Sequence, residues 1–136
     1  MNRPEQVIWA AGFFDGEGCI SVSRSTKGKR YIYYSLQIRA FQNDRAPLDI
    51  LQSLFGGRLC RRDKGWLWDL AGPRTIHALA EMMPFFVVKR SQAQVAVIFQ
   101  TRKTKKGGKY PNPVAARDAD HRDFVVLRDL KLIREV

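Results

Sequence analysis

The chain has 136 residues, of which 45% are hydrophobic, and its 24 Lys and Arg against 13 Asp and Glu give a net charge of +11. It has no run of eighteen apolar residues and no apolar segment at its start, so neither a membrane-spanning helix nor a secretory signal is expected. Cys19 and Cys60 are widely separated and fit neither a disulfide framework nor a metal motif, which indicates a reduced, intracellular protein.

The first third of the chain predicts a helix followed by a hairpin. Residues Glu5–Phe14 form a helical pattern with an unusually small centre, and two glycines soon after end it. Cys19–Ser25 and Arg30–Phe41 alternate between apolar and polar residues, which is typical of strands with one buried face. The turn residues Thr26–Lys29 between them predict a hairpin.

The middle of the chain repeats this order. A helix capped by Asp44 is closed by a pair of glycines. Arg58–Arg62 and Trp66–Leu70 form a second hairpin, and a third helix follows Pro73.

The last third predicts two more helices, Lys89–Gln100 and Asp120–Ile133, with a basic loop at Thr101–Pro113 between them. The order is therefore α-β-β-α-β-β-α-α-α, an α+β chain expected to form a single domain over residues 1–136. Two hairpins can join into one four-stranded antiparallel sheet with the helices on one face. The other face would be a saddle that keeps Ser, Gln, Tyr, Lys and Arg side chains.

Basic residues gather in three segments. Residues 17–45 carry six basic and two acidic side chains, residues 58–64 carry four and one, and residues 89–109 carry seven and none. Such blocks on an otherwise balanced chain favour a polyanion-binding face. Charge alone does not separate this from a merely basic protein, such as a ribosomal one.

Residues Ala10–Gly18 read A-A-G-F-F-D-G-E-G, which resembles the LAGLIDADG motif of homing endonucleases, with Ala10 in place of Leu and Glu17 in place of the second Asp. The segments FQNDR at 41–45 and PFFVVKRSQA at 84–93 are similar to the family's Gln-containing stretch and its basic active-site segment. The resemblance implies a homodimeric DNA endonuclease that makes double-strand breaks in a long pseudo-palindromic target during intron homing, in an organelle or in the bacterial cytoplasm.

The resemblance also assigns the site. It implies that Glu17 and the carbonyl of Gly16 bind Mg²⁺, for which Mn²⁺ or Ca²⁺ could substitute in binding, with no other cofactor. A lone carboxylate among basic residues would repel DNA phosphate unless a cation bridged them. Gln42 would order water, Lys89 would stabilise charge, and Arg45 would contact phosphate. The alternatives are that Glu17 caps a turn and that Lys89 and Arg45 only anchor phosphates.

The small centre of the first helix predicts close helix packing. A chain with one motif needs a second copy to cut both strands, so we expect a two-fold dimer through this helix. Its interface is expected to include Ala10, Gly12, Phe13 and Asp15, with Asp15 holding the helix end rather than binding metal. The alternative is that Ala10 and Gly12 pack in the chain's own core.

The polar sheet face is expected to read bases in the major groove. Its expected contacts are Ser21, Ser23, Ser25, Lys27, Lys29, Tyr31, Tyr33, Ser35, Gln37, Arg39, Arg58, Arg62 and Asp69. The basic loop would add the phosphate anchors Arg102, Lys103, Lys105, Lys106 and Lys109, for which a solvated linker is the alternative.

Two other functions fit the same fold, namely an RNA-binding intron maturase and a non-cutting DNA-binding protein. The presence of Glu17, Gln42 and Lys89 together favours cutting, because a pure binder has no use for an acid that faces phosphate.

Overall fold

The computed structural model describes residues 1–25, 33–105 and 113–135. The helices are α1 (Arg3–Glu17), α2 (Ala46–Phe55), α3 (Arg74–Met82), α4 (Arg90–Lys105) and α5 (Pro113–Glu135), with a 3₁₀ turn η1 (Met83–Phe85). The strands are β1 (Gly18–Ser25), β2 (Tyr33–Gln42), β3 (Arg58–Arg62) and β4 (Gly65–Ala71). The predicted order of helices and strands is confirmed.

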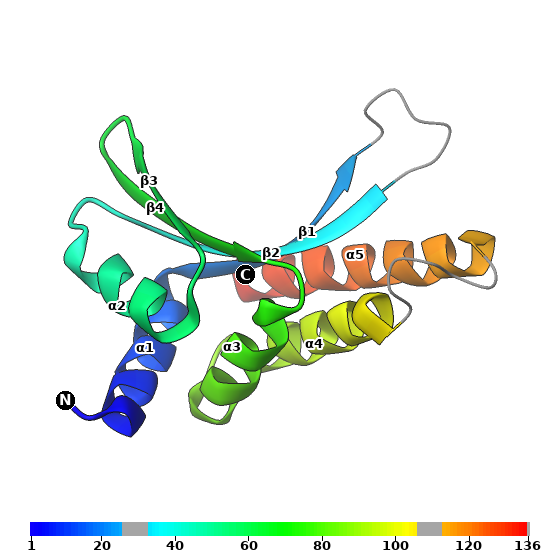
Figure 1. Ribbon diagram of the computed structural model, residues 1–136. Coiled ribbons are helices and arrows are strands. Elements are labelled where there is room, and N and C mark those ends of the chain that lie inside the picture. Colours follow the sequence, from blue (N-terminus) through cyan, green and yellow to red (C-terminus); the bar gives the residue numbers. More distant parts are fainter. Residues whose placement is uncertain (26–32, 106–112, 136) are drawn as a thin grey trace.

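The strands form one antiparallel sheet in the order β1-β2-β4-β3. The register places Ile20, Ile38 and Leu70 side by side on neighbouring strands, and each is at most 1% exposed. This apolar face meets the helices, which Figure 1 shows gathered on one side of a curved sheet. The predicted α+β fold, with one open sheet face, is confirmed.

The end of α1 packs into the centre of the core. Phe14 is fully buried, and its ring meets Trp68 edge-on at 6.4 Å and Phe86 in a stacked arrangement at 5.9 Å between centroids. Large aromatic side chains contribute much of the apolar area that a small domain buries. The C-terminal end of α1 is therefore held rigidly against β4 and the chain that follows η1.

Several predicted boundaries are wrong. Helix α1 starts earlier, at Arg3 after the N-cap Asn2, and runs on to Glu17. The basic loop was predicted to begin at Thr101, but α4 continues to Lys105, and α5 begins at Pro113 rather than Asp120. Ion pairs from Arg102 and Lys103 in the last turn of α4 to Asp120 and Asp123 in the first half of α5 explain the longer α4, since they give its charged residues partners.

In the described part of the chain, no helix combines the length and the apolar character needed to cross a membrane.

Candidate functional site

Glu17 lies at the junction between α1 and β1. It is the last residue of α1, not the residue beyond its end as predicted, and its side chain is exposed. Gly16 is also exposed, with open space where a side chain would stand. A Cβ at Gly18 would instead overlap the buried ring of Phe14. The tight packing of Gly18 thus fixes the turn that presents Glu17 at the surface.

Asp15 ties the end of α1 to the segment before α4. Its carboxylate accepts hydrogen bonds from the backbone N–H groups of Val87 at 2.9 Å, Val88 at 3.0 Å and Lys89 at 2.8 Å. Burial acts to raise the pKa of Asp15, but these donors and the charge of Lys89 outweigh it, and the pKa lies below its ordinary value. Asp15 is therefore engaged within its own chain, in line with the structural role expected for it.

Lys89 lies beneath the same junction. It is 1% exposed, and its Nζ donates to the backbone carbonyl of Asp15 at 2.7 Å. This carbonyl belongs to the last turn of α1, where carbonyl groups lack helical partners. The ammonium group of Lys89 thus contacts the backbone two residues before Glu17.

Gln42 comes to the same end of the sheet. The register pairs Gly18 with Ala40, so Gln42, two residues further along β2, lies level with the end of α1. Arg45 is engaged elsewhere: it pairs with Asp49 at 3.0 Å and lies over the ring of Trp66 at 4.8 Å. Gln42 therefore flanks the junction, whereas the guanidinium group of Arg45 is held at the start of α2.

The oxygen donors at the junction suit a hard divalent cation. In the described part of the chain, no group of three or more His, Cys, Asp or Glu side chains could enclose a metal ion. The exposed Glu17 carboxylate and the Gly16 carbonyl offer two oxygen ligands. Mg²⁺ is commonly held by one or two carboxylates, with waters and substrate phosphates completing its shell. The donor set therefore fits a cation shared with a phosphate substrate rather than a closed protein cage.

The open face of the sheet carries the predicted base-reading residues in cross-strand rows. Ser23 and Ser35 face each other with hydroxyl oxygens 3.0 Å apart, and Arg39 donates a hydrogen bond to Gln37. The rows also hold Ser21 opposite Gln37 and Ser25 opposite Tyr33. Lys27, Lys29 and Tyr31 lie outside the described residues.

Asp69 stands between two arginines on this face. In the register it is opposite Arg39 on β2 and Arg58 on β3, and it accepts hydrogen bonds from Arg58 Nη2 at 2.8 Å and Nε at 3.2 Å. Of the described strand residues that point to the open face, Asp69 is the single acid. The Oδ2 atom of Asp69 therefore accepts from Arg58, so any contact from Asp69 to a base would be made in addition to this hydrogen bond.

The phosphate anchors predicted after Gln100 have protein partners. Arg102 pairs with Asp120 at 2.6 Å and with Asp123 at 2.9 Å, and Lys103 pairs with Asp120 at 3.1 Å. They hold α4 against α5, so the expectation of a free basic loop at these two residues is wrong. Lys106 and Lys109 lie outside the described residues, as does the side chain of Lys105.

The outer face of α1 carries apolar and small residues. Ile8 is 50% exposed, and Gly12 and Gly16 follow it at intervals of four residues with open space around them. Phe13 is half-buried and stacks on Trp9 with centroids 5.3 Å apart. Ala10 is fully buried in the chain's own core, so its expected place in a dimer interface is wrong, whereas Gly12 is free to meet a partner.

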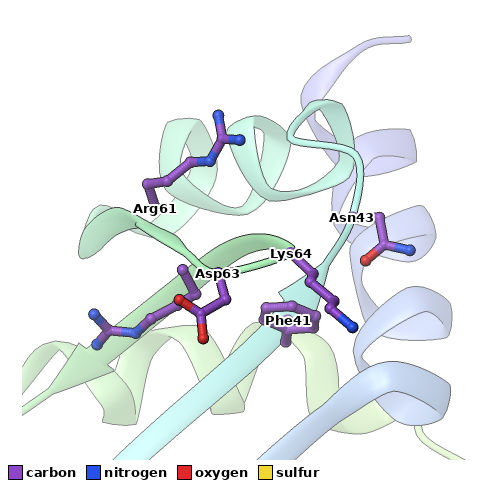
Figure 2. Close-up of a pocket in the computed structure, with 6 residues that line it drawn as sticks. Phe41, Asn43, Arg61, Asp63 and Lys64 are labelled. Carbon is purple, nitrogen blue, oxygen red and sulfur yellow. The ribbon is translucent and has the colours of Figure 1, made fainter.

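Sequence reasoning missed a surface hollow at the tip of the β3–β4 hairpin. It is lined by Phe41, Asn43, Arg61, Arg62, Asp63 and Lys64 (Figure 2). The turn residues were predicted as a turn and counted as basic, but the sequence pattern does not show that their side chains converge with the end of β2.

A comparison with protein families matches residues 10–103 to the family described as LAGLIDADG endonuclease. A sequence comparison with curated proteins finds no significant match.

Solved structures of homing endonucleases share the fold. I-CvuI in complex with its target, in the presence of 2 mM Ca, has a TM-score of 0.73 and 18% identity, covering 96% of this chain and 82% of that chain. I-CvuI with the I-CreI target, in 2 mM Mg with the DNA not cleaved, has a TM-score of 0.69 and 21% identity over 76% and 71%. The archaeal, intron-encoded I-Vdi141I complexed with DNA has a TM-score of 0.69 and 14% identity over 94% and 98%. At these identities the likeness establishes the fold.

Proposed function

The chain belongs to the LAGLIDADG endonuclease family, and we propose that it is a site-specific DNA endonuclease. In this proposal it makes double-strand breaks in a long, pseudo-palindromic target by divalent-metal-dependent hydrolysis of phosphodiester bonds. The observation that carries the proposal is the exposed Glu17 at the end of α1, two residues after the carbonyl that Lys89 Nζ binds, with Gln42 two residues beyond Ala40, the register partner of Gly18.

The residues at the junction divide the work. Glu17 and the Gly16 carbonyl would hold Mg²⁺, which would supply polarisation of a phosphate and a lowered pKa of a water molecule. Gln42 holds a water molecule beside the junction. Lys89, fixed by the Asp15 carbonyl, places a positive charge that stabilises the extra negative charge of the transition state. The I-CvuI complexes were determined with Ca or Mg, which supports a divalent cation.

The open sheet face binds the duplex. Its hydroxyl, amide and guanidinium groups stand in rows on a curved surface, and a ribbon of strands fits the major groove. The similar homing endonucleases complexed with DNA support double-stranded DNA as the partner.

A homodimer supplies the second active site. The outer face of α1 offers Ile8, Gly12 and Gly16, so a second copy of α1 can approach closely. Val87 and Val88, whose N–H groups donate to Asp15, are 88% and 46% exposed and add apolar surface near the end of α1. A two-fold axis here would place one Glu17 near each strand of a pseudo-palindromic target.

A cleavage-site selection from randomised duplexes, with and without Mg²⁺, tests the proposal. We expect one long site to be enriched and cut on both strands with Mg²⁺, and no cutting in EDTA. Enrichment by binding without cutting in any divalent cation would instead indicate the non-cutting alternative, and enrichment of structured RNA over duplex DNA would indicate the maturase.

A further inference from the structure

The hollow at the hairpin tip has a volume of about 820 Å³ and lies where the end of β2 meets the turn between β3 and β4. Gly65 holds the two together, since a Cβ there would come within 2.5 Å of the Gln42 carbonyl and 3.0 Å of Asn43 Cα. The hollow is therefore built from both neighbours of Gln42, Phe41 and Asn43, together with the hairpin turn.

Two cations at the hollow have no partner of their own. Within the part of the chain that the structure describes, Arg62 and Lys64 make no hydrogen bond or ion pair. Other cations of this chain, such as Arg58 and Arg102, are paired with carboxylates. Neighbouring cations without such partners leave a local excess of positive charge that an anion would relieve.

The third cation of the hollow is engaged differently. The guanidinium group of Arg61 lies over the Trp66 ring at 5.3 Å, on the side of the sheet that faces the helices. Figure 2 shows Arg61 directed away from Lys64 and Phe41, whereas Lys64 extends past Phe41 toward Asn43. The lining groups left to bind an anion are therefore Arg62, Lys64 and the amide of Asn43, and Asp63 adds an opposing charge to the lining.

The remaining wall is apolar. Phe41 points to the open face of the sheet, and 44% of it is exposed. An exposed ring beside two cations suits a nucleotide backbone, because the ring can contact the deoxyribose while the cations bind the phosphate. A small free anion would leave the ring uncovered.

We propose that this hollow binds one backbone phosphate of the duplex, near the bond that is cut. The inference rests on the proposed function and adds a contact that the open-face rows do not supply. Its position follows from Gln42, which lies level with the end of α1 and thus with Glu17. The contact fixes the register of the duplex at the cutting site and carries no base preference.

Affinity measurements on single-charge variants test the proposal. In Ca²⁺, Lys64→Gln and Arg62→Gln should each weaken binding by about tenfold, the effect of one charge-assisted hydrogen bond. The loss should be equal for specific and random duplexes, and the slope of log affinity against log salt should fall by about 1. Asp63→Asn should tighten binding, because it removes a negative charge from the lining.

A matched control separates a site from general charge. Arg122→Gln makes the same charge change at an exposed residue of α5, in the helix layer, and should leave affinity unchanged. If Arg122→Gln weakens binding as much as Lys64→Gln does, the hollow is not a site and the proposal is overturned.

Neutral methylphosphonate linkages then locate the contact. Replacing one phosphate beside the cut should weaken binding of the unaltered protein but not of Lys64→Gln, since the partner charge is already gone. Coupling of Lys64→Gln only to phosphates at the outer ends of the target would contradict the proposal. Competition by inorganic phosphate with duplex binding, beyond its effect on ionic strength, would also contradict it. A protein that binds no duplex at all would instead contradict the proposed function.

Discussion

Lys89 and Asp15 are joined twice: the backbone N–H of Lys89 donates to the Asp15 carboxylate at 2.8 Å, and its Nζ donates to the Asp15 backbone carbonyl at 2.7 Å. These residues are 74 positions apart in the sequence. The double contact fixes the end of α1 to the segment before α4. The position of Glu17 relative to Lys89 is therefore set by the first acid of the motif.

Replacing Asp15 should cost stability in a pH-dependent way. Asp15→Asn removes charge-assisted hydrogen bonds and should lower the free energy of unfolding at neutral pH by about 1.5–3 kcal/mol. Because the folded pKa of Asp15 is lowered, its stabilisation is present above the unfolded value of about 3.9 and is lost as the pH falls through the folded pKa. Denaturant unfolding of both proteins from pH 7 to pH 2 measures this.

The two stability curves should converge toward the lowest pH. Asp63→Asn, an exposed acid in the hairpin turn, is the control and should track the unaltered protein throughout. Parallel curves for Asp15→Asn and the unaltered protein would show that the carboxylate does not anchor the helix end.

Gly18 should be intolerant of a side chain. Gly18→Ala would drive a methyl group into the Phe14 ring, which is packed between Trp68 and Phe86. Overpacking of this kind should destabilise the fold by about 1–3 kcal/mol. Thermal unfolding would measure the loss, and an unchanged melting temperature would mean that the junction is looser than the structure shows.

Gly12 should respond in the opposite sense. Gly12→Ala meets open space in the monomer, so helix propensity alone should stabilise α1 by about 0.5–1 kcal/mol. In a dimer with closely approaching α1 helices, the same methyl group should weaken association. Sedimentation velocity over a dilution series measures the dimer, with exposed Gln94→Ala on α4 as control. A dimer unaffected by Gly12→Ala would place the interface elsewhere.

Asp69 should act on base preference through Arg58. Asp69→Asn weakens the partner that orients Arg58, so discrimination at one base pair should fall by about tenfold or more. Arg58→Lys should lose preference at the same base pair, and the double variant should be no worse than Arg58→Lys alone. Site selection by binding in Ca²⁺ reports this. Losses at two different base pairs would mean that Asp69 contacts a base itself.

Local sequence patterns were sufficient to predict the order of helices and strands and the buried face of the sheet. The alternation in β2 predicted that Leu36 and Ile38 face the core, and they are 1% and 0% exposed. The resemblance at Ala10–Gly18 and at residues 84–93 likewise brought Glu17 and Lys89 into one hypothesis, because a resemblance carries spatial information that composition lacks.

Contacts between distant segments could not be predicted. The carboxylates that pair with Arg102 come from residues 18 and 21 positions later, and no period links them to α4. A run of basic residues therefore suggested a free loop where the structure has paired helices. The hollow at the hairpin was hidden for the same reason, since it joins β2 to a turn that follows α2.

The most direct measurement is plasmid cleavage by Glu17→Gln, beside its affinity for the selected target. Loss of the metal-binding carboxylate should reduce cutting of both strands by at least about a thousandfold, since a bound metal supplies several kcal/mol of charge stabilisation. Binding should be unchanged or tighter, because a negative charge near phosphate is gone. Glu5→Gln, an exposed acid in the first turn of the same helix, should cut normally. Cutting by Glu17→Gln at the rate of the unaltered protein would contradict the assignment of Glu17.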